Sequence, residues 1–337
     1  MMKLQALNYP RFGAALLSLA MLVAADAAPP VRDKGYIEAL RAADMRVAAI
    51  GHRLAVANAA LCVDQQVQPG LLLHALSQYA PAYRSAIRSG FRFTRDIAVE
   101  GVVAGSTGAQ AGIAADDQLV AIDGRELPID LPSSAARPDT ARRDAAYGLI
   151  AALPRDRAVD VAVERAGQRL NLQMNPEVGC RARFEVTGDD NAGADSAIVQ
   201  IGAGLLERFD DAALAVIIAH ELSHIILRSE ARLSAAGARF GLLSEVGKSG
   251  RLHRQAEQEA DRLSVYLLYN AGYAPLSAGQ FWRGAGRRLD AGIFRSRKYA
   301  DWRTRAVMLD TEAGMIPARA ARPFVPAMVA LRDAPMR

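Results

Sequence analysis

Cysteine and histidine are scarce in this 337-residue sequence, which contains two cysteines and five histidines. Long apolar runs are also missing, because no stretch beyond the N-terminal segment approaches the roughly 20 apolar residues that a membrane-spanning helix needs. Neither the composition nor any low-complexity tract indicates a disordered chain. The roughly 310 residues after the N-terminal segment are enough for two domains.

The N-terminal segment, residues 1–27, has the pattern of a secretory signal peptide. Lys3 and Arg11 precede an apolar core from Gly13 to Ala25, and Ala25 and Ala27 fit an A-x-A cleavage pattern. No cysteine follows at the lipid-attachment position, so we expect a soluble periplasmic or secreted product. The alternative is an uncleaved segment that anchors the protein to the inner membrane.

Export would place Cys62 and Cys180 in an oxidising compartment, where disulfides form and persist. We therefore expect a disulfide between these two residues. A bond also requires their Cα atoms to approach within about 7 Å, which only the tertiary structure decides.

Positive charge is concentrated in one late segment, residues 283–305, although the formal net charge is only +5. Its basic residues are Arg283, Arg287, Arg288, Arg295, Arg297, Lys298, Arg303 and Arg305, against Asp290 and Asp301. A solvated helical face accounts for this pattern. The nearby Trp282 and Trp302 leave contact with a membrane surface or an acidic partner as the alternative. We expect no nucleic acid partner outside the cytoplasm.

The stretch from Asp210 to Ser229, DDAALAVIIAHELSHIILRS, predicts a largely buried helix, because aspartates offer an N-cap and neither Gly nor Pro follows. His220 and His224 lie one turn apart on one face, the spacing at which two imidazoles bind one zinc ion. Glu221 beside them can take a proton from a zinc-bound water, whose pKa the metal lowers to about 7. The alternative, two histidines satisfied within the core, is disfavoured because an unpaired polar cluster among apolar neighbours is costly.

Two histidines leave a catalytic zinc short of its usual third protein ligand. The metzincin pattern is excluded, because the Gly and His that it requires further along the chain are absent. A second helix, predicted over residues 251–271, carries His253, Glu257 and Asp261 at four-residue steps, near one face. We expect one of these three side chains to reach the metal.

The paired motifs HELSH and EQEAD resemble the gluzincin metallopeptidases of the HtpX and CAAX prenyl protease type, particularly their periplasmic, BepA-like branch. The resemblance covers residues 180–273 and, more loosely, residues 36–62. It implies that Glu257 is the third zinc ligand. By its position on the predicted helix, His253 is the rival ligand. The resemblance also implies that Asp261 supports a ligand histidine from the second shell.

The same family carries a later His-Pro element before an arginine, and here Tyr299-Ala300 stands in that place before Arg305. The departure puts in doubt any late histidine that acts on the metal or on the oxyanion. We expect Arg305 to lie on the surface, with a role at the oxyanion as the alternative.

Residues 91–175 differ in character from the rest of the chain. Short strands are predicted at 97–103, 118–122, 159–164 and 170–174, between Gly-rich turns, together with a helix over 139–153. The segment VVAGSTGAQAGIAADDQLVAIDGREL resembles a PDZ domain. The resemblance implies a module that adds an extended peptide to a sheet edge, with residues 90–93 as the candidate carboxylate-binding loop. The alternative is a β-rich insertion without a ligand.

Helices are predicted over residues 36–60 and 71–89, the second with a break near Pro81. The lone His52 and His74 in these segments are expected to be structural. After Cys180, strands over 183–187 and 196–201 should form a small sheet beside the metal helix, and an edge of this sheet would hold a substrate in extended form.

We therefore expect an α+β fold, in which a mainly helical gluzincin-like metalloprotease domain with a small sheet is interrupted by a β-rich PDZ-like insertion. The expected boundaries are a signal peptide (1–27), N-terminal helices (28–90), the PDZ-like domain (91–175), the zinc metalloprotease core (176–320) and a C-terminal tail (321–337).

The expected function is that of an exported endopeptidase with one Zn²⁺ per chain. It would cleave protein or peptide substrates, among them misfolded envelope proteins. The alternative is a peptide-binding scaffold or chaperone-like protein whose zinc site is structural, or latent beneath a loop over residues 232–250.

Overall fold

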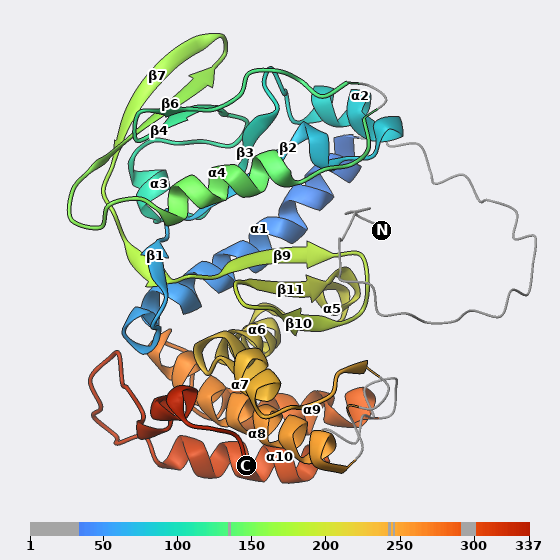
Figure 1. Ribbon diagram of the computed structural model, residues 1–337, viewed down its shortest axis with the longest axis vertical. Helices are drawn as coiled ribbons and strands as arrows, with labels where there is room; N and C mark the ends of the chain where they lie inside the picture. The colour runs from blue at the N-terminus through green and yellow to red at the C-terminus, as the bar shows by residue number, and fades with distance from the viewer. Residues whose placement is uncertain (1–33, 134–135, 242–243, 245–246, 291–300) are drawn as a thin grey trace, which may run out of the picture.

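The computed structural model describes residues 34–133, 136–241, 244, 247–290 and 301–337, so the predicted signal peptide lies outside the described residues. A long first helix, α1 (Lys34–Ala57), runs between a part built on a six-stranded sheet and a mainly helical part with a three-stranded sheet (Figure 1). The predicted α+β class is confirmed.

The larger sheet has the strand order β2-β3-β4-β6-β7, all antiparallel, with the short β5 beside β4. Its strands are β2 (Leu71–Ala75), β3 (Ile97–Val102), β4 (Gln118–Ile122), β5 (Arg125–Glu126), β6 (Val159–Arg165) and β7 (Gln168–Met174). The short helix α3 (Thr107–Gln110) precedes β4, and α4 (Ala141–Ala151) packs against β2. The strands and the helix predicted between residues 97 and 174 are confirmed.

The predicted helix over residues 71–89 is wrong in its first half. Residues 71–75 form β2, which pairs with β3 so that Ala75 lies opposite Ile97. A short 3₁₀ turn, η2 (Leu76–Gln78), follows, and only α2 (Pro81–Gly90) is helical. A short apolar run is compatible with a strand and with a helix. Here the pairing with β3 makes residues 71–75 a strand. The larger sheet therefore begins before residue 91.

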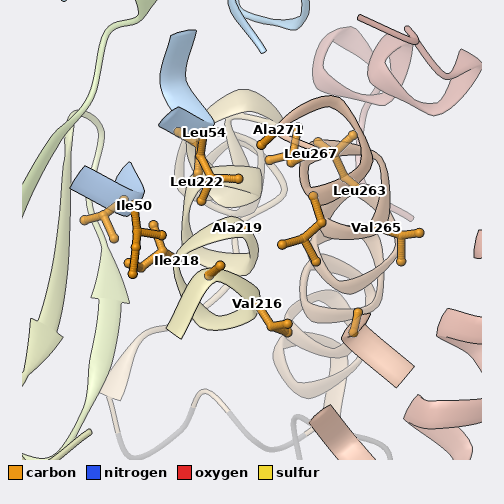
Figure 2. Close-up of a cluster of buried hydrophobic side chains, with 14 of the residues drawn as sticks. Ile50, Leu54, Val216, Ile218, Ala219, Leu222, Leu263, Val265, Leu267 and Ala271 are labelled. Atoms are coloured by element: carbon orange, nitrogen blue, oxygen red, sulfur yellow. The ribbon is translucent and has the colours of Figure 1, made fainter. Parts of the chain in front are cut away.

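The helical part is built around the packing of α6 (Asp211–Ile226) against α8 (Gly247–Asn270). Figure 2 shows Ile218 and Leu222 of α6 beside Ile50 and Leu54 of α1, with side chains of α8 on the other side of α6. The N-cap is as predicted, because the Asp210 carboxylate accepts a hydrogen bond from the N–H of Ala213 at 2.8 Å. Because most residues of α6 are apolar and most are buried, the helix holds the HELSH motif within the core.

The smaller sheet lies against α6, as predicted, in the order β10-β11-β9. It consists of β9 (Arg183–Thr187), β10 (Ala192–Ala194) and β11 (Ile198–Gly202), with β9 parallel and β10 antiparallel to β11. The other helices in the described part of the chain are η1 (Ala59–Leu61), α5 (Ala203–Arg208), α7 (Ser229–Ala235), α9 (Ser277–Asp290), α10 (Trp302–Gly314) and η4 (Ala327–Asp333).

A disulfide joins Cys62 and Cys180, whose Cα atoms are 5.4 Å apart, so the predicted bond is confirmed. Beside it, β1 (Gln65–Val67) pairs with β8 (Val178–Cys180). The bond and this strand pair hold together the two ends of the segment that carries the larger sheet.

None of the described helices is by itself long and apolar enough to cross a bilayer. By length and composition, α6 and α7 pass this test together across a bend of 46°. In this structure α6 is the central helix of the packed core.

Candidate metal centre

Three of the predicted ligand residues meet between α6 and α8. His220, His224 and Glu257 each offer one ligand atom, and these atoms all lie within 4.8 Å of one another. His220 Nε2 is 3.1 Å from Glu257 Oε2 and 3.2 Å from His224 Nε2. Two imidazole nitrogens and one carboxylate oxygen form a donor set of catalytic zinc sites, in which the fourth position is left for water or substrate. The residues present therefore fit a zinc ion.

The rival ligand His253 lies away from this cluster, although it is one turn before Glu257 on α8. Its Nε2 is 3.0 Å from the carbonyl oxygen of Arg239, and its ring packs against Phe240. Four residues advance a helix by about 6 Å along its axis, so the crossing with α6 selects one of the equally spaced positions. Glu259 faces elsewhere and pairs with buried Arg232 at 2.6 Å.

Asp261 lies behind His220, in the position that the family resemblance implies. Its Oδ1 is 2.9 Å from His220 Nδ1. A proton on Nδ1 directed at this carboxylate turns Nε2 towards Glu257 and His224. Asp261 thus orients the histidine without belonging to the group of three.

The expected surface position of Arg305 is wrong. Its side chain is buried and makes two hydrogen bonds to Asp261. The sequence motif contained a signal for this pairing, since a buried aspartate beside two potential ligands needs a counter-charge. The pattern along the chain did not show which arginine supplies it.

The basic segment 283–305 is only partly within the described residues, which omit 291–300. Arg283 pairs with Asp310 on α10 at 2.5 Å, and Trp282 packs against the main core. Contact of the segment with a membrane surface stays a prediction.

Burial and mutual contact shift the pKa values of the cluster. Burial alone would lower the pKa of His220, but its hydrogen bonds to Asp261 and Glu257 outweigh burial and raise the pKa to about 10. Burial opposes ionisation of Glu257 as well, yet the charge of His224 and hydrogen bonds from both histidines hold its pKa well below the ordinary value. The two opposite pKa shifts favour a protonated His220 beside an ionised Glu257.

Glu221 is 9% exposed and lies next in sequence to His220. Burial raises its pKa above the ordinary value, and the charges of His220 and His224 oppose the rise only in part. A carboxylate with a raised pKa is a stronger base, which is the property that proton abstraction from water requires.

The edge strand β10 lies beside α6 and pairs only with β11 among the strands that the structure describes. Its residues Ala192, Gly193 and Ala194 are half-buried and small, so its backbone can be approached closely. The two predicted strands are β9 and β11, and β10, which was not predicted, forms one edge of their sheet. Substrate binding at an edge of this sheet stays a prediction.

In the candidate carboxylate-binding loop, residues 90–93, the N–H groups of Phe91, Arg92 and Phe93 donate to α2 carbonyl oxygens at 2.9, 3.4 and 3.0 Å, so they are engaged within the chain. Gly90 ends α2, and the Phe91 and Phe93 rings are buried in a cluster with Ile87 and Tyr79. The two aromatic side chains are needed inside, which the sequence pattern of a Gly-containing loop did not reveal.

A cavity of about 50 Å³ lies instead at the start of β2. Gly70 and Leu71 line it together with Tyr147 and Ile150 of α4 and with Arg183 of β9. This cavity therefore lies between the larger sheet and β9 of the smaller sheet.

The outer edge of β2 adjoins this cavity. The Gly70 carbonyl and the Leu76 N–H form hydrogen bonds on the side of β3, each at 2.8 Å. Successive residues of a strand direct their backbone N–H and C=O groups to opposite sides within the sheet. Leu71, Leu73 and Ala75 therefore direct these groups away from β3.

Two of these outward N–H groups already donate hydrogen bonds to side chains within the protein. The N–H of Leu73 donates to the Tyr147 hydroxyl at 2.8 Å, and that of Ala75 donates to Gln78 Oε1 at 3.0 Å. In this structure the edge is closed to a further strand at these two positions.

Comparison with known proteins gives no family for the chain. No family model matches it, and no curated protein matches it. Among solved structures, the chain is similar to the HtrA3 PDZ domain in its crystal structure with a phage-derived ligand, FGRWV. The similarity covers 34% of this chain and 88% of that chain, with 16% identity and a TM-score of 0.23.

Proposed function

We propose that this protein is a zinc-dependent endopeptidase whose centre is formed by His220, His224 and Glu257. The observation that carries the proposal is the convergence of these three ligand atoms within 4.8 Å, with buried Glu221 next to the first of them. A bound zinc ion would polarise a water molecule and the carbonyl of the scissile peptide bond.

In this proposal, Glu221 acts as general base and then as general acid. Its carboxylate takes a proton from the attacking water and passes the proton to the leaving amine nitrogen. Asp261 keeps His220 in its orientation, and the free edge of β10 aligns an extended substrate beside α6. This division of roles matches peptide bond hydrolysis and requires no further cofactor.

The proposal is tested by comparing casein cleavage by the wild-type chain and by Glu221→Gln, with Glu230→Gln as the control. Glu230 is an exposed glutamate on α7, so its substitution should leave cleavage unchanged. Glu221→Gln should keep its zinc and lose roughly 10²–10⁴-fold in rate, because the base is removed while the ligands stay. Undiminished cleavage by Glu221→Gln would contradict the mechanism.

A second candidate function is peptide capture without hydrolysis, with a structural or latent zinc site. The observation that favours it is the outer edge of β2 beside a small cavity, a place where an extended peptide could be added once Tyr147 withdraws. The loop predicted as a cover, residues 232–250, begins within α7, where Arg232 is fixed by Glu259. This alternative would be favoured if the wild-type protein bound zinc and peptide but did not cleave casein.

A further inference from the structure

The guanidinium of Arg305, on α10, reaches the buried carboxylate behind His220. Arg305 Nε donates to Asp261 Oδ2 at 2.7 Å, and Nη2 donates to Oδ1 at 2.5 Å. The same Oδ1 is 2.9 Å from His220 Nδ1. Arg305 and Asp261 are only 6% and 4% exposed. One carboxylate oxygen is therefore shared between the arginine and the histidine, in a place largely closed to water.

Trp282, on α9, covers a face of this guanidinium. Arg305 Cζ lies 3.6 Å from the centre of the indole ring, a close cation–π contact. The helices α9 and α10 pack against each other. Both helices lie outside the HELSH and EQEAD motifs, so the support of His220 comes from a separate part of the chain.

We infer that Arg305 and Trp282 are positioning residues for His220. Arg305 fixes the plane of the Asp261 carboxylate, and Trp282 fixes the plane of the guanidinium. The carboxylate then keeps a proton on His220 Nδ1 and turns Nε2 towards Glu257 and His224. The inference rests on the proposed function only where it identifies Nε2 as the atom that binds zinc.

The physical reason is that a carboxylate accepts hydrogen bonds in several directions and rotates about its Cβ–Cγ bond. One contact with an imidazole does not fix its plane, whereas two N–H groups of a rigid guanidinium do. The arginine also compensates a charge that would be costly if it were buried without a partner. Because Nε and Nη2 are both engaged with Asp261, the geometry favours support of the ligand over a direct role at the oxyanion.

The experiment compares Arg305→Met, Arg305→Lys and Trp282→Leu with the control Arg262→Met. Arg262 is a matched control because it also links α8 to α10, through hydrogen bonds to Glu312 at 2.7 and 3.4 Å. The zinc dissociation constant is measured by competition with a chromogenic chelator. The His220 Nδ1–H signal is followed by ¹⁵N-edited NMR in the metal-free protein, together with thermal unfolding of every variant.

We expect Arg305→Met to weaken zinc binding by roughly 10- to 100-fold, as loss of a supporting partner does in other metal sites. Arg305→Lys should restore part of the affinity, and Trp282→Leu should weaken binding less than Arg305→Met does. The Nδ1–H signal should be lost to exchange with water in Arg305→Met and persist in Arg262→Met. If Arg305→Met does not fold, Arg305→Lys and Trp282→Leu carry the test.

Two results would overturn the inference. One is wild-type zinc affinity with an unchanged Nδ1–H signal in the Arg305 and Trp282 variants. The other is an equal loss of both properties in Arg262→Met, which would mean that general packing of α10 is responsible. A wild-type chain that binds no zinc would contradict the proposed function instead, while the NMR comparison would still test the positioning role.

Discussion

Glu257, rather than His253, faces the histidine pair on α6, since His253 Nε2 is already 3.0 Å from a backbone carbonyl. We predict that Glu257→Ala lowers zinc affinity by at least about 10-fold, because the site would retain only two protein ligands. His253→Ala should bind zinc like the wild type. Metal analysis and chelator competition on the purified variants measure both effects. Full zinc occupancy in Glu257→Ala, with loss in His253→Ala, would reverse the assignment.

The raised pKa of His220 predicts a pH dependence of zinc uptake. Its folded-state pKa of about 10 lies above the ordinary value of 6.5. Protonated His220 therefore stabilises the metal-free fold fully below about pH 6.5, and this stability is lost as the pH rises through about 10. Zinc must displace the proton on His220 Nε2. Zinc binding therefore becomes tighter as the pH rises, because the proton is then easier to remove.

Between pH 7 and 9 we expect about one proton to be released per zinc ion bound, with affinity rising roughly tenfold per pH unit. Titration calorimetry in buffers of different protonation enthalpy counts the protons directly. The variant His253→Ala serves as the control, because that histidine lies outside the cluster. Zinc binding without proton release would show that His220 is already neutral in the metal-free protein.

In the second candidate function, the contact between β2 and α4 would limit how the larger sheet receives a peptide. The Tyr147 hydroxyl accepts the N–H of Leu73 and so takes the place of a peptide carbonyl. We predict that Tyr147→Phe tightens peptide binding about fivefold, which corresponds to the roughly 1 kcal/mol of one competing hydrogen bond. The probe is a fluorescein-labelled pentapeptide with an apolar C-terminal residue, and binding is measured by fluorescence anisotropy.

Tyr83→Phe is the matched control for this measurement, because Tyr83 lies on α2 and packs in a different cluster. An amidated version of the probe tests whether a free carboxylate contributes near Arg183, which lines the cavity at the start of β2. Unchanged or weaker binding by Tyr147→Phe would mean that the hydroxyl does not compete with the peptide.

The Cys62–Cys180 bond closes a loop with a sequence separation of 118 residues. In the chain-entropy model a loop longer than 100 residues contributes roughly 4–5 kcal/mol, less any strain in the folded state. We predict that the double variant Cys62→Ser, Cys180→Ser loses roughly 2–5 kcal/mol of unfolding free energy. The variant should still fold, because the β1–β8 pair holds the same two ends together.

Urea denaturation of the wild type and of the double variant measures this loss. Thiol labelling of the non-reduced wild-type protein after denaturation should find no reactive cysteine. Two reactive thiols would refute the bond, and an unchanged urea midpoint in the variant would show that the strand pair alone secures the junction.

The local patterns of the sequence determined much of the candidate site. His220 and His224 share a face because four residues make about one helical turn, and this holds wherever the helix packs. The strands between residues 97 and 174 were also predictable, because Gly-rich turns mark their ends locally. The sequence by itself thus established the helices that carry the HELSH and EQEAD motifs and most of the larger sheet.

The tertiary structure decided the features that depend on a distant partner. Leu71–Ala75 is a strand because β3 pairs with it, and Phe91 is inside because α1 and α2 enclose it with other apolar side chains. The crossing of α6 with α8 selects Glu257 among equally spaced positions, and α10 buries Arg305 against Asp261. Each outcome depends on contacts between segments far apart in the chain, and no periodicity within a single segment encodes such contacts.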